Sequence, residues 1–309
     1  MEIQSLSIVV PGGCPNDCTF CCSKLNREKK CYRNQMENNH QFQDLYERDY
    51  LDCMEFASRN GCNTMMYTGD GEPLMNRTFM EMVTRLNNSL HNPFIWIELQ
   101  TSGVFLTKRS KDNDGYENLR WLRNYIRVKT ISLSLASIWD SRQNALYTRP
   151  KNEHAFVDIE KTCKAIKDYD FTLRLSLNMT DFYNDKSPEA IFERAAALGA
   201  DQITFRVLYN ISNPQTEAEK EIHDWIKQRS CDPAKIGEIK EYITNQHGIP
   251  LERLPFGATK YSVHDMSCVL DDDCMSSNTE NIKNEVKYVI LRPTAKIYTK
   301  WERPGSRLF

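Results

Sequence analysis

The sequence predicts an α/β fold, a partial, open (β/α)6 TIM-like barrel followed by a small C-terminal extension. Short β-like runs alternate with longer helix-like runs six times, most β-like runs have one apolar and one polar face, and the alternation stops near residue 212. Such alternation is typical of stacked βα units around a parallel sheet. With 309 residues, 40% of them hydrophobic, the chain is long enough for one large core.

The expected strands are short, and most are rich in aliphatic residues. They cover residues 5–10, 64–68, 94–100, 130–136, 172–178 and 202–208. Helices are expected near 41–60, 76–90, 114–126, 153–168 and 187–199, where apolar residues recur every three to four positions.

The polar face of these strands indicates what the barrel encloses. In the fifth strand the leucines at 173, 175 and 177 alternate with Arg174, Ser176 and Asn178. A closed eight-stranded barrel fills its interior with branched apolar side chains, so a polar inner face favours an open barrel that holds a ligand. An ordinary sheet with one solvated face is the alternative.

Residues 213–309 are expected to form an extension of the 1–212 core. Two helices are expected near 215–230 and 233–246, followed by an irregular segment after Gly248. The β-like runs 286–292 and 296–301 around a short turn predict a terminal β-hairpin.

Charge and cysteine content restrict the function. A formal net charge of -2 gives no overall attraction to nucleic acid or to an anionic membrane. No apolar run approaches the roughly 18 residues of a membrane span, and the first residues lack the features of a secretory signal. We therefore expect a cytoplasmic protein, in which eleven cysteines favour metal or redox chemistry over disulfides.

Three cysteines directly follow the first expected strand. Cys14, Cys18 and Cys21 are separated by three and two residues, on a loop at the end where parallel barrels build their active sites. Three thiolates leave one iron of a 4Fe-4S cluster without a protein ligand, and chemistry can occur there. A zinc site would need a fourth ligand, for which Cys31 is possible.

With Phe20 before its last cysteine, this motif resembles that of the radical S-adenosylmethionine (SAM) superfamily, and the resemblance covers roughly residues 5–208. After the second strand, Gly69, Asp70, Gly71 and Glu72 precede a proline, which is similar to the family's Gly-Gly-Glu-Pro element with Asp70 between the glycines. Residues 101–103, Thr-Ser-Gly, are similar to its Thr-Asn-Gly.

The resemblance implies a SAM site around these motifs. The turn 69–72 would cradle the methionine ammonium, with Glu72 as an acceptor, while Ser102 and Phe20 would lie against the cofactor. Ser134 and Asn178 occupy strand positions where relatives place polar groups for the ribose and carboxylate of SAM. These assignments follow from the resemblance.

The same resemblance implies the reaction. The reduced cluster would cleave SAM to a 5'-deoxyadenosyl radical, which abstracts a hydrogen atom from a substrate. An external one-electron donor such as flavodoxin or ferredoxin would supply the electron. The alternatives are a peptide- or protein-modifying enzyme of this type, such as an activase or maturase, and a non-enzymatic zinc or iron-sulfur binding module.

Two arginines on the polar face point to the substrate. Arg174 and Arg206 lie on adjacent strands, and converging guanidinium groups suit a phosphate or carboxylate. We therefore expect a small anionic, nucleotide-like substrate, with Glu98 also facing it and Arg174 alternatively holding the carboxylate of SAM. An internal ion pair with Glu98 is the competing interpretation.

A second cluster is not expected. Cys268 and Cys274 flank an acidic segment before the terminal hairpin, a position faintly similar to the SPASM-type cluster appendages of the molybdopterin-precursor cyclase and of peptide-modifying relatives. No cysteine follows Cys274, so this pair lacks the further ligands that a cluster needs.

Overall fold

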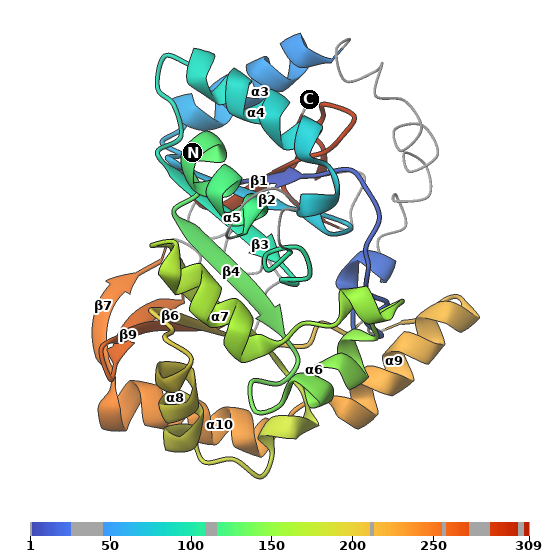
Figure 1. The fold of residues 1–309 in the computed structure, drawn as a ribbon, viewed down its shortest axis with the longest axis vertical. Helices are drawn as coiled ribbons and strands as arrows, with labels where there is room; N and C mark the ends of the chain where they lie inside the picture. The colour runs from blue at the N-terminus through green and yellow to red at the C-terminus, as the bar shows by residue number, and fades with distance from the viewer. Residues whose placement is uncertain are drawn as a thin grey trace.

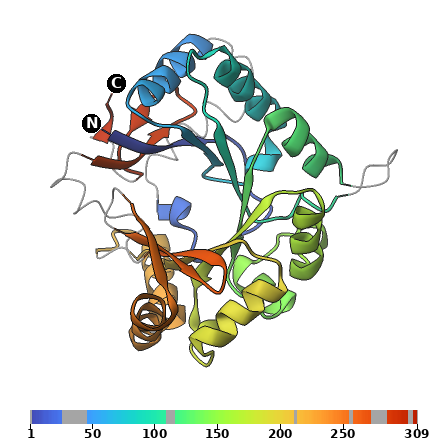
Figure 2. The same cartoon turned by 90° about the vertical axis from the view of Figure 1, so that its left-hand side faces the viewer.

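The computed structural model describes residues 2–25, 46–108, 116–210, 213–254, 258–271, 285–301 and 306–308. Their strands form one eleven-stranded sheet in the order β11-β10-β1-β2-β3-β4-β5-β6-β9-β8-β7 (Figures 1 and 2). The six central strands, all parallel, are β1 (Glu2–Val9), β2 (Thr64–Thr68), β3 (Trp96–Thr101), β4 (Thr130–Leu135), β5 (Thr172–Met179) and β6 (Gln202–Val207). The predicted fold class is confirmed.

The alternation along the strands separates the core from the inner face. Leu173, Leu175 and Leu177 of β5 are fully buried in the apolar core, whereas Arg174 and Asn178 between them are half-buried. Burying aliphatic side chains between sheet and helices is the main source of stability in such a fold. The opposite face is left for polar groups.

Helices cover the outer face of the sheet (Figure 2). The predicted ones are α3 (Glu47–Arg59), α4 (Arg77–Ser89), α5 (Glu117–Trp121), α7 (Ile159–Asp168) and α8 (Pro188–Ala197). Three of them begin at a side-chain oxygen that accepts a backbone N–H, from Asn76 for α4, Asp158 for α7 and Ser187 for α8.

Helix α6 (Ser141–Thr148) was not predicted from the sequence. Its apolar residues Ala145, Leu146 and Tyr147 are consecutive rather than periodic, so it carries no amphipathic pattern. It begins at the Asp140 cap and ends at Arg149, whose φ of 49° lies in the left-handed region. This end directs the chain toward the cysteine loop.

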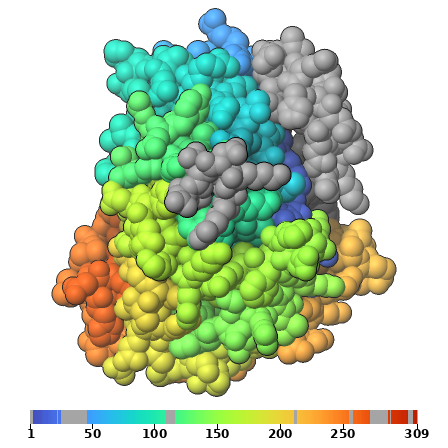
Figure 3. All heavy atoms as spheres, in the orientation of Figure 1, coloured from blue at the N-terminus to red at the C-terminus, as the bar shows by residue number. Residues whose placement is uncertain are grey.

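The segment after residue 212 begins as expected and then departs from the prediction. Helices α9 (Glu217–Arg229) and α10 (Pro233–Glu241) form, and α9 projects beside the N-terminal residues in Figure 3. The expected irregular segment is wrong, because β7 (Ile249–Arg253), β8 (Thr259–Val263) and β9 (Met266–Asp271) are strands. The β8–β9 turn places His264 and Asp265 at positive φ, a hairpin turn that usually announces itself by glycine or asparagine.

The terminal hairpin is confirmed, with β10 (Glu285–Leu291) antiparallel to β11 (Ile297–Tyr298). Strand β10 also pairs in parallel with β1, and β9 pairs in parallel with β6. The segment after residue 212 therefore extends the barrel sheet at both edges, while its division from the 1–212 core stays a prediction. Within the described ranges, no helix combines the length and apolar character needed to cross a membrane.

Candidate functional site

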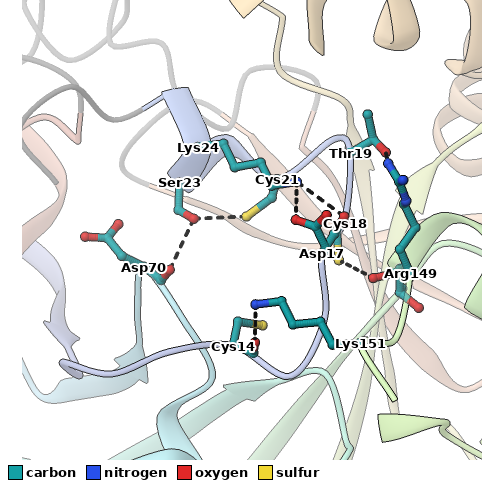
Figure 4. Close-up of polar contacts among 11 residues, drawn as sticks. Cys14, Asp17, Cys18, Thr19, Cys21, Ser23, Lys24, Asp70, Arg149 and Lys151 are labelled. Carbon is teal, nitrogen blue, oxygen red and sulfur yellow. Dashed lines mark hydrogen bonds and ion pairs between the residues drawn. The ribbon is translucent and has the colours of Figure 1, made fainter. Parts of the chain in front are cut away.

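The cysteine loop leaves the carboxyl end of β1. Figure 4 shows the thiols of Cys14, Cys18 and Cys21 around a common space, with Asp70 on its far side. All three cysteines are free and partly exposed. Among the described residues, no group of three or more His, Cys, Asp or Glu side chains has the geometry to hold a metal ion.

The electrostatics of the loop favour a cationic centre. Burial raises the pKa of the Cys14 thiol, and the nearby Glu72 carboxylate and Cys21 raise it further. Burial also raises the pKa of Cys18, with smaller contributions from Cys21 and Cys14. Such thiols resist ionisation without a positive charge beside them, and bound iron supplies that charge. Three clustered cysteine thiols thus fit the donor set of a 4Fe-4S cluster.

The segment after α6 fastens this loop. The backbone N–H of Asp17 donates to Arg149 O at 2.9 Å, and that of Lys151 donates to Pro15 O at 2.9 Å. The Lys151 Nζ donates to the carbonyl oxygen of Cys14, also at 2.9 Å (Figure 4). The loop is therefore held by a segment more than a hundred residues away along the chain.

The turn after β2 packs directly on the cysteine loop. The Glu72 N–H donates to Gly13 O at 2.9 Å. A Cβ on Gly71 would lie 2.2 Å from Gly13 O and 2.7 Å from Gly12 O, closer than any side chain tolerates. Gly71 is thus required for the contact between the two loops, because only a residue without a Cβ fits.

Glu72 is buried and joins this turn to the end of β3. Its carboxylate accepts hydrogen bonds from Thr101 Oγ1 at 2.6 Å, the Ser102 N–H at 2.8 Å and Ser102 Oγ at 2.7 Å. Burial raises the pKa of the Glu72 carboxyl, and these bonds partly offset the rise. The structure brings Glu72 and Ser102 together, and their roles toward SAM remain predictions.

Phe20 lies in an aromatic row beside the loop. Its ring stacks on Trp225 of α9 at a centroid distance of 5.9 Å. Trp225 meets Tyr147 edge to face at 4.9 Å, and Tyr147 stacks on Phe182 at 4.4 Å. Helix α9 is thereby attached to the cysteine loop.

The inner face of the barrel carries the remaining predicted residues. Arg174 Nη1 forms an ion pair with Glu98 at 2.5 Å, and Arg174 Nε donates to Gln202 Oε1 at 2.8 Å. The competing interpretation of an internal ion pair is therefore realised for Arg174. Further toward the carboxyl ends, Asn178 Nδ2 donates to Ser134 Oγ at 3.1 Å.

Arg206 lies opposite Asn178 in the register of β5 and β6. Sequence reasoning did not single out Lys151, Thr101 or Arg292, which contact the cysteine loop, Glu72 and Asp70. Thr101 adjoins the predicted Ser102, so its position offered a signal. Cys268 is buried in β9, and Cys274 and Cys31 lie outside the described residues.

A family model described as the radical SAM superfamily matches residues 8–203. The chain belongs to the radical SAM superfamily. It is accordingly an enzyme that uses a 4Fe-4S cluster and SAM, acts on a substrate and needs an electron donor. The matched range runs from β1 into β6 and includes the cysteine loop and the Gly69–Glu72 turn.

Solved structures show the same fold. A structure of native anSMEcpe with bound AdoMet has a TM-score of 0.50 and 14% identity, over 79% of this chain and 63% of that one. A radical SAM methyltransferase from Sphaerobacter thermophilus has a TM-score of 0.43 and 13% identity, over 72% and 63%. The radical SAM chain thus spans less than two thirds of either protein. No curated protein sequence matches it.

Proposed function

We propose that this radical SAM enzyme abstracts a hydrogen atom from a small anionic substrate, with Cys14, Cys18 and Cys21 as its cluster ligands. One observation carries the ligand assignment: the three thiols surround a common space beside the Gly69–Glu72 turn (Figure 4). When bound, the cluster and SAM supply the radical chemistry, the reductive cleavage of SAM to a 5'-deoxyadenosyl radical.

The residues around the loop position the cofactors. The contact of Gly71 with Gly13 keeps the turn against the cysteine loop, so a ligand bound to one adjoins the other. Thr101 and Ser102 fix the Glu72 carboxylate and leave the turn little freedom. Preorganised groups cost no rearrangement when the ligand arrives.

The substrate class follows from the inner face. Arg174 is paired with Glu98, so we assign the anion-binding role to Arg206, whose planar guanidinium suits a phosphate or carboxylate. Ser176 on the same face has a buried hydroxyl with no hydrogen-bond partner among the described residues. Buried polar groups are normally paired, and a substrate hydroxyl or phosphate oxygen would satisfy this one.

Two further features belong to the proposal. An external one-electron donor such as flavodoxin or ferredoxin reduces the cluster, and the enzyme acts in the cytoplasm, where eleven cysteines stay reduced. A net charge of -2 favours a small substrate over nucleic acid.

Anaerobic reconstitution tests the ligand assignment. The wild-type chain should take up about four irons and, with SAM and a reductant, release 5'-deoxyadenosine. Replacing Cys14, Cys18 or Cys21 with alanine should abolish both. Cys163→Ala is the matched control, because that thiol is buried in α7, and it should keep its iron. An intact cluster in any of the first three variants would refute the assignment.

The substrate class is tested separately by turnover. A panel of nucleotides and a panel of peptides are supplied with SAM and reductant, and loss of each compound is followed by mass spectrometry. The proposal expects modification of an anionic small molecule that falls at least tenfold in Arg206→Ala, since losing a charge-assisted contact costs about 2 kcal/mol or more. Modification of peptides alone would replace it with the maturase or activase interpretation.

A further inference from the structure

Arg292 is a fully buried cation at the carboxyl end of the sheet. It directly follows β10, which pairs in parallel with β1 in a register that sets Leu291 beside Ile8. Its side chain has 0% exposure. A buried guanidinium costs stability unless its charge is paired, so its partners indicate why it is there.

Its charge partner belongs to the predicted cofactor turn. Arg292 Nη1 lies 3.1 Å from Asp70 Oδ2, and Nη2 donates to Trp301 O at 2.6 Å. The guanidinium also lies 5.2 Å from the centroid of the Trp301 ring and 5.9 Å from that of Tyr298. These contacts fix the planar group on both faces and edges.

The hairpin turn that carries Arg292 is itself anchored. The Tyr50 hydroxyl donates to Pro293 O at 2.5 Å, and Cys53 Sγ donates to Ala295 O at 3.6 Å. Both donors lie on α3, in the apolar core. The position of Arg292 is therefore set by the hairpin and by the helix beneath it.

Asp70 connects this anchor to a cysteine. Its carbonyl oxygen accepts a hydrogen bond from Ser23 Oγ at 3.3 Å, and Ser23 Oγ lies 3.0 Å from Cys21 Sγ (Figure 4). A continuous set of contacts thus runs from Arg292 through Asp70 and Ser23 to Cys21.

We propose that Arg292 is a positioning residue, through which the β10–β11 hairpin holds the Gly69–Glu72 turn in place for SAM and for the cluster at Cys21. This inference rests on the proposed placement of both cofactors. The role accounts for an aspartate between the two glycines of the turn, since only an acidic side chain pairs with the buried cation. The hairpin is then a working part of the site.

The test compares Arg292→Met, Arg292→Lys and Asp70→Asn with a matched control. Arg194→Met removes another half-buried arginine that also donates to one backbone carbonyl, Ile138 O, and one carboxylate, Glu160, on the outer helices. For each reconstituted protein we would measure iron content, the dissociation constant of SAM, the melting temperature, and the EPR spectrum of the reduced cluster with and without SAM.

Arg292→Met and Asp70→Asn should weaken SAM binding by about tenfold to a hundredfold, the range for groups that orient ligands, and alter the EPR change caused by SAM. Arg292→Lys should fall between them and wild type, because it keeps the charge without the fork. Arg194→Met should lower only the melting temperature.

SAM affinity and EPR spectra equal to wild type in Arg292→Lys and Asp70→Asn would overturn the inference, even if Arg292→Met fails to fold. A wild-type protein that assembles no cluster or binds no SAM would instead contradict the proposed function. The two failures are therefore distinguishable.

Discussion

The Nζ of Lys151 donates a hydrogen bond to the carbonyl oxygen of Cys14 at 2.9 Å. The first cysteine of the loop is thereby fixed by a side chain that follows α6, and Lys151 also lowers the pKa of the Cys14 thiol against the larger effect of burial. The contact places one cation beside the thiols that we assign to the cluster.

Lys151→Met should loosen this attachment and remove a charge that favours the Cys14 thiolate. We expect the reconstituted cluster to lose iron about tenfold faster on dilution or exposure to a chelator, because groups that orient ligands typically affect metal affinity by that factor. Iron release is followed by visible absorbance. Lys161→Met, at an exposed site on α7, is the control, and equal rates in the two variants would contradict the role of Lys151.

Gly71→Ala should separate the turn from the cysteine loop. The added Cβ would lie 2.2 Å from Gly13 O, and backbone cannot move aside as a flexible side chain does. We expect a lower melting temperature and a reduced iron content after reconstitution.

Gly237→Ala is the matched control for this prediction. Gly237 lies in α10 with nothing within 4 Å of its added Cβ, so alanine should stabilise the helix by up to about 1 kcal/mol. Normal iron uptake by Gly71→Ala would show that the two loops do not have to touch.

Glu72→Gln should destabilise the protein even without cofactors. The carboxylate accepts three bonds of 2.8 Å or shorter from Thr101 and Ser102, whereas an amide offers one acceptor oxygen. An unpaired buried donor costs about 1–3 kcal/mol, more than the relief from burying a neutral group at this hydrogen-bonded position. Urea unfolding measures the loss, and exposed Glu117→Gln should stay within about 0.5 kcal/mol.

The sequence predicted the barrel because its strands are regular. Alternating leucines in β5 and serines in β4 identify faces of a sheet, and these patterns depend only on neighbours along the chain. The strands β7 to β9 were missed because their exposed or half-exposed residues show no such alternation. Their turn at His264 and Asp265 also lacks the usual residues.

The site was predictable only where a motif marks it. Cys14, Cys18 and Cys21 stand on one short loop, so their proximity follows from their spacing. Lys151 and Arg292 act across 137 and 222 positions, and no local pattern reports which distant side chain a folded sheet brings to a loop. The same limit applies to Arg174, for which the sequence left an ion pair and a ligand contact open.

The last prediction separates these two roles of Arg174. Its partner Glu98 has a side chain only 7% exposed, while that of Arg174 is 28% exposed. Arg174→Met leaves the Glu98 carboxylate without its cation, so unfolding free energy should fall, by less than the about 3–5 kcal/mol typical of fully buried pairs. Adding Glu98→Gln should recover part of this loss, and the double-mutant cycle measures the coupling. If the pair is purely structural, SAM titration of the reconstituted Arg174→Met protein matches wild type. Should SAM bind more weakly in Arg174→Met while Glu98→Gln binds it normally, the guanidinium contacts the cofactor carboxylate as well, and the assignment of Arg174 to structure alone is wrong.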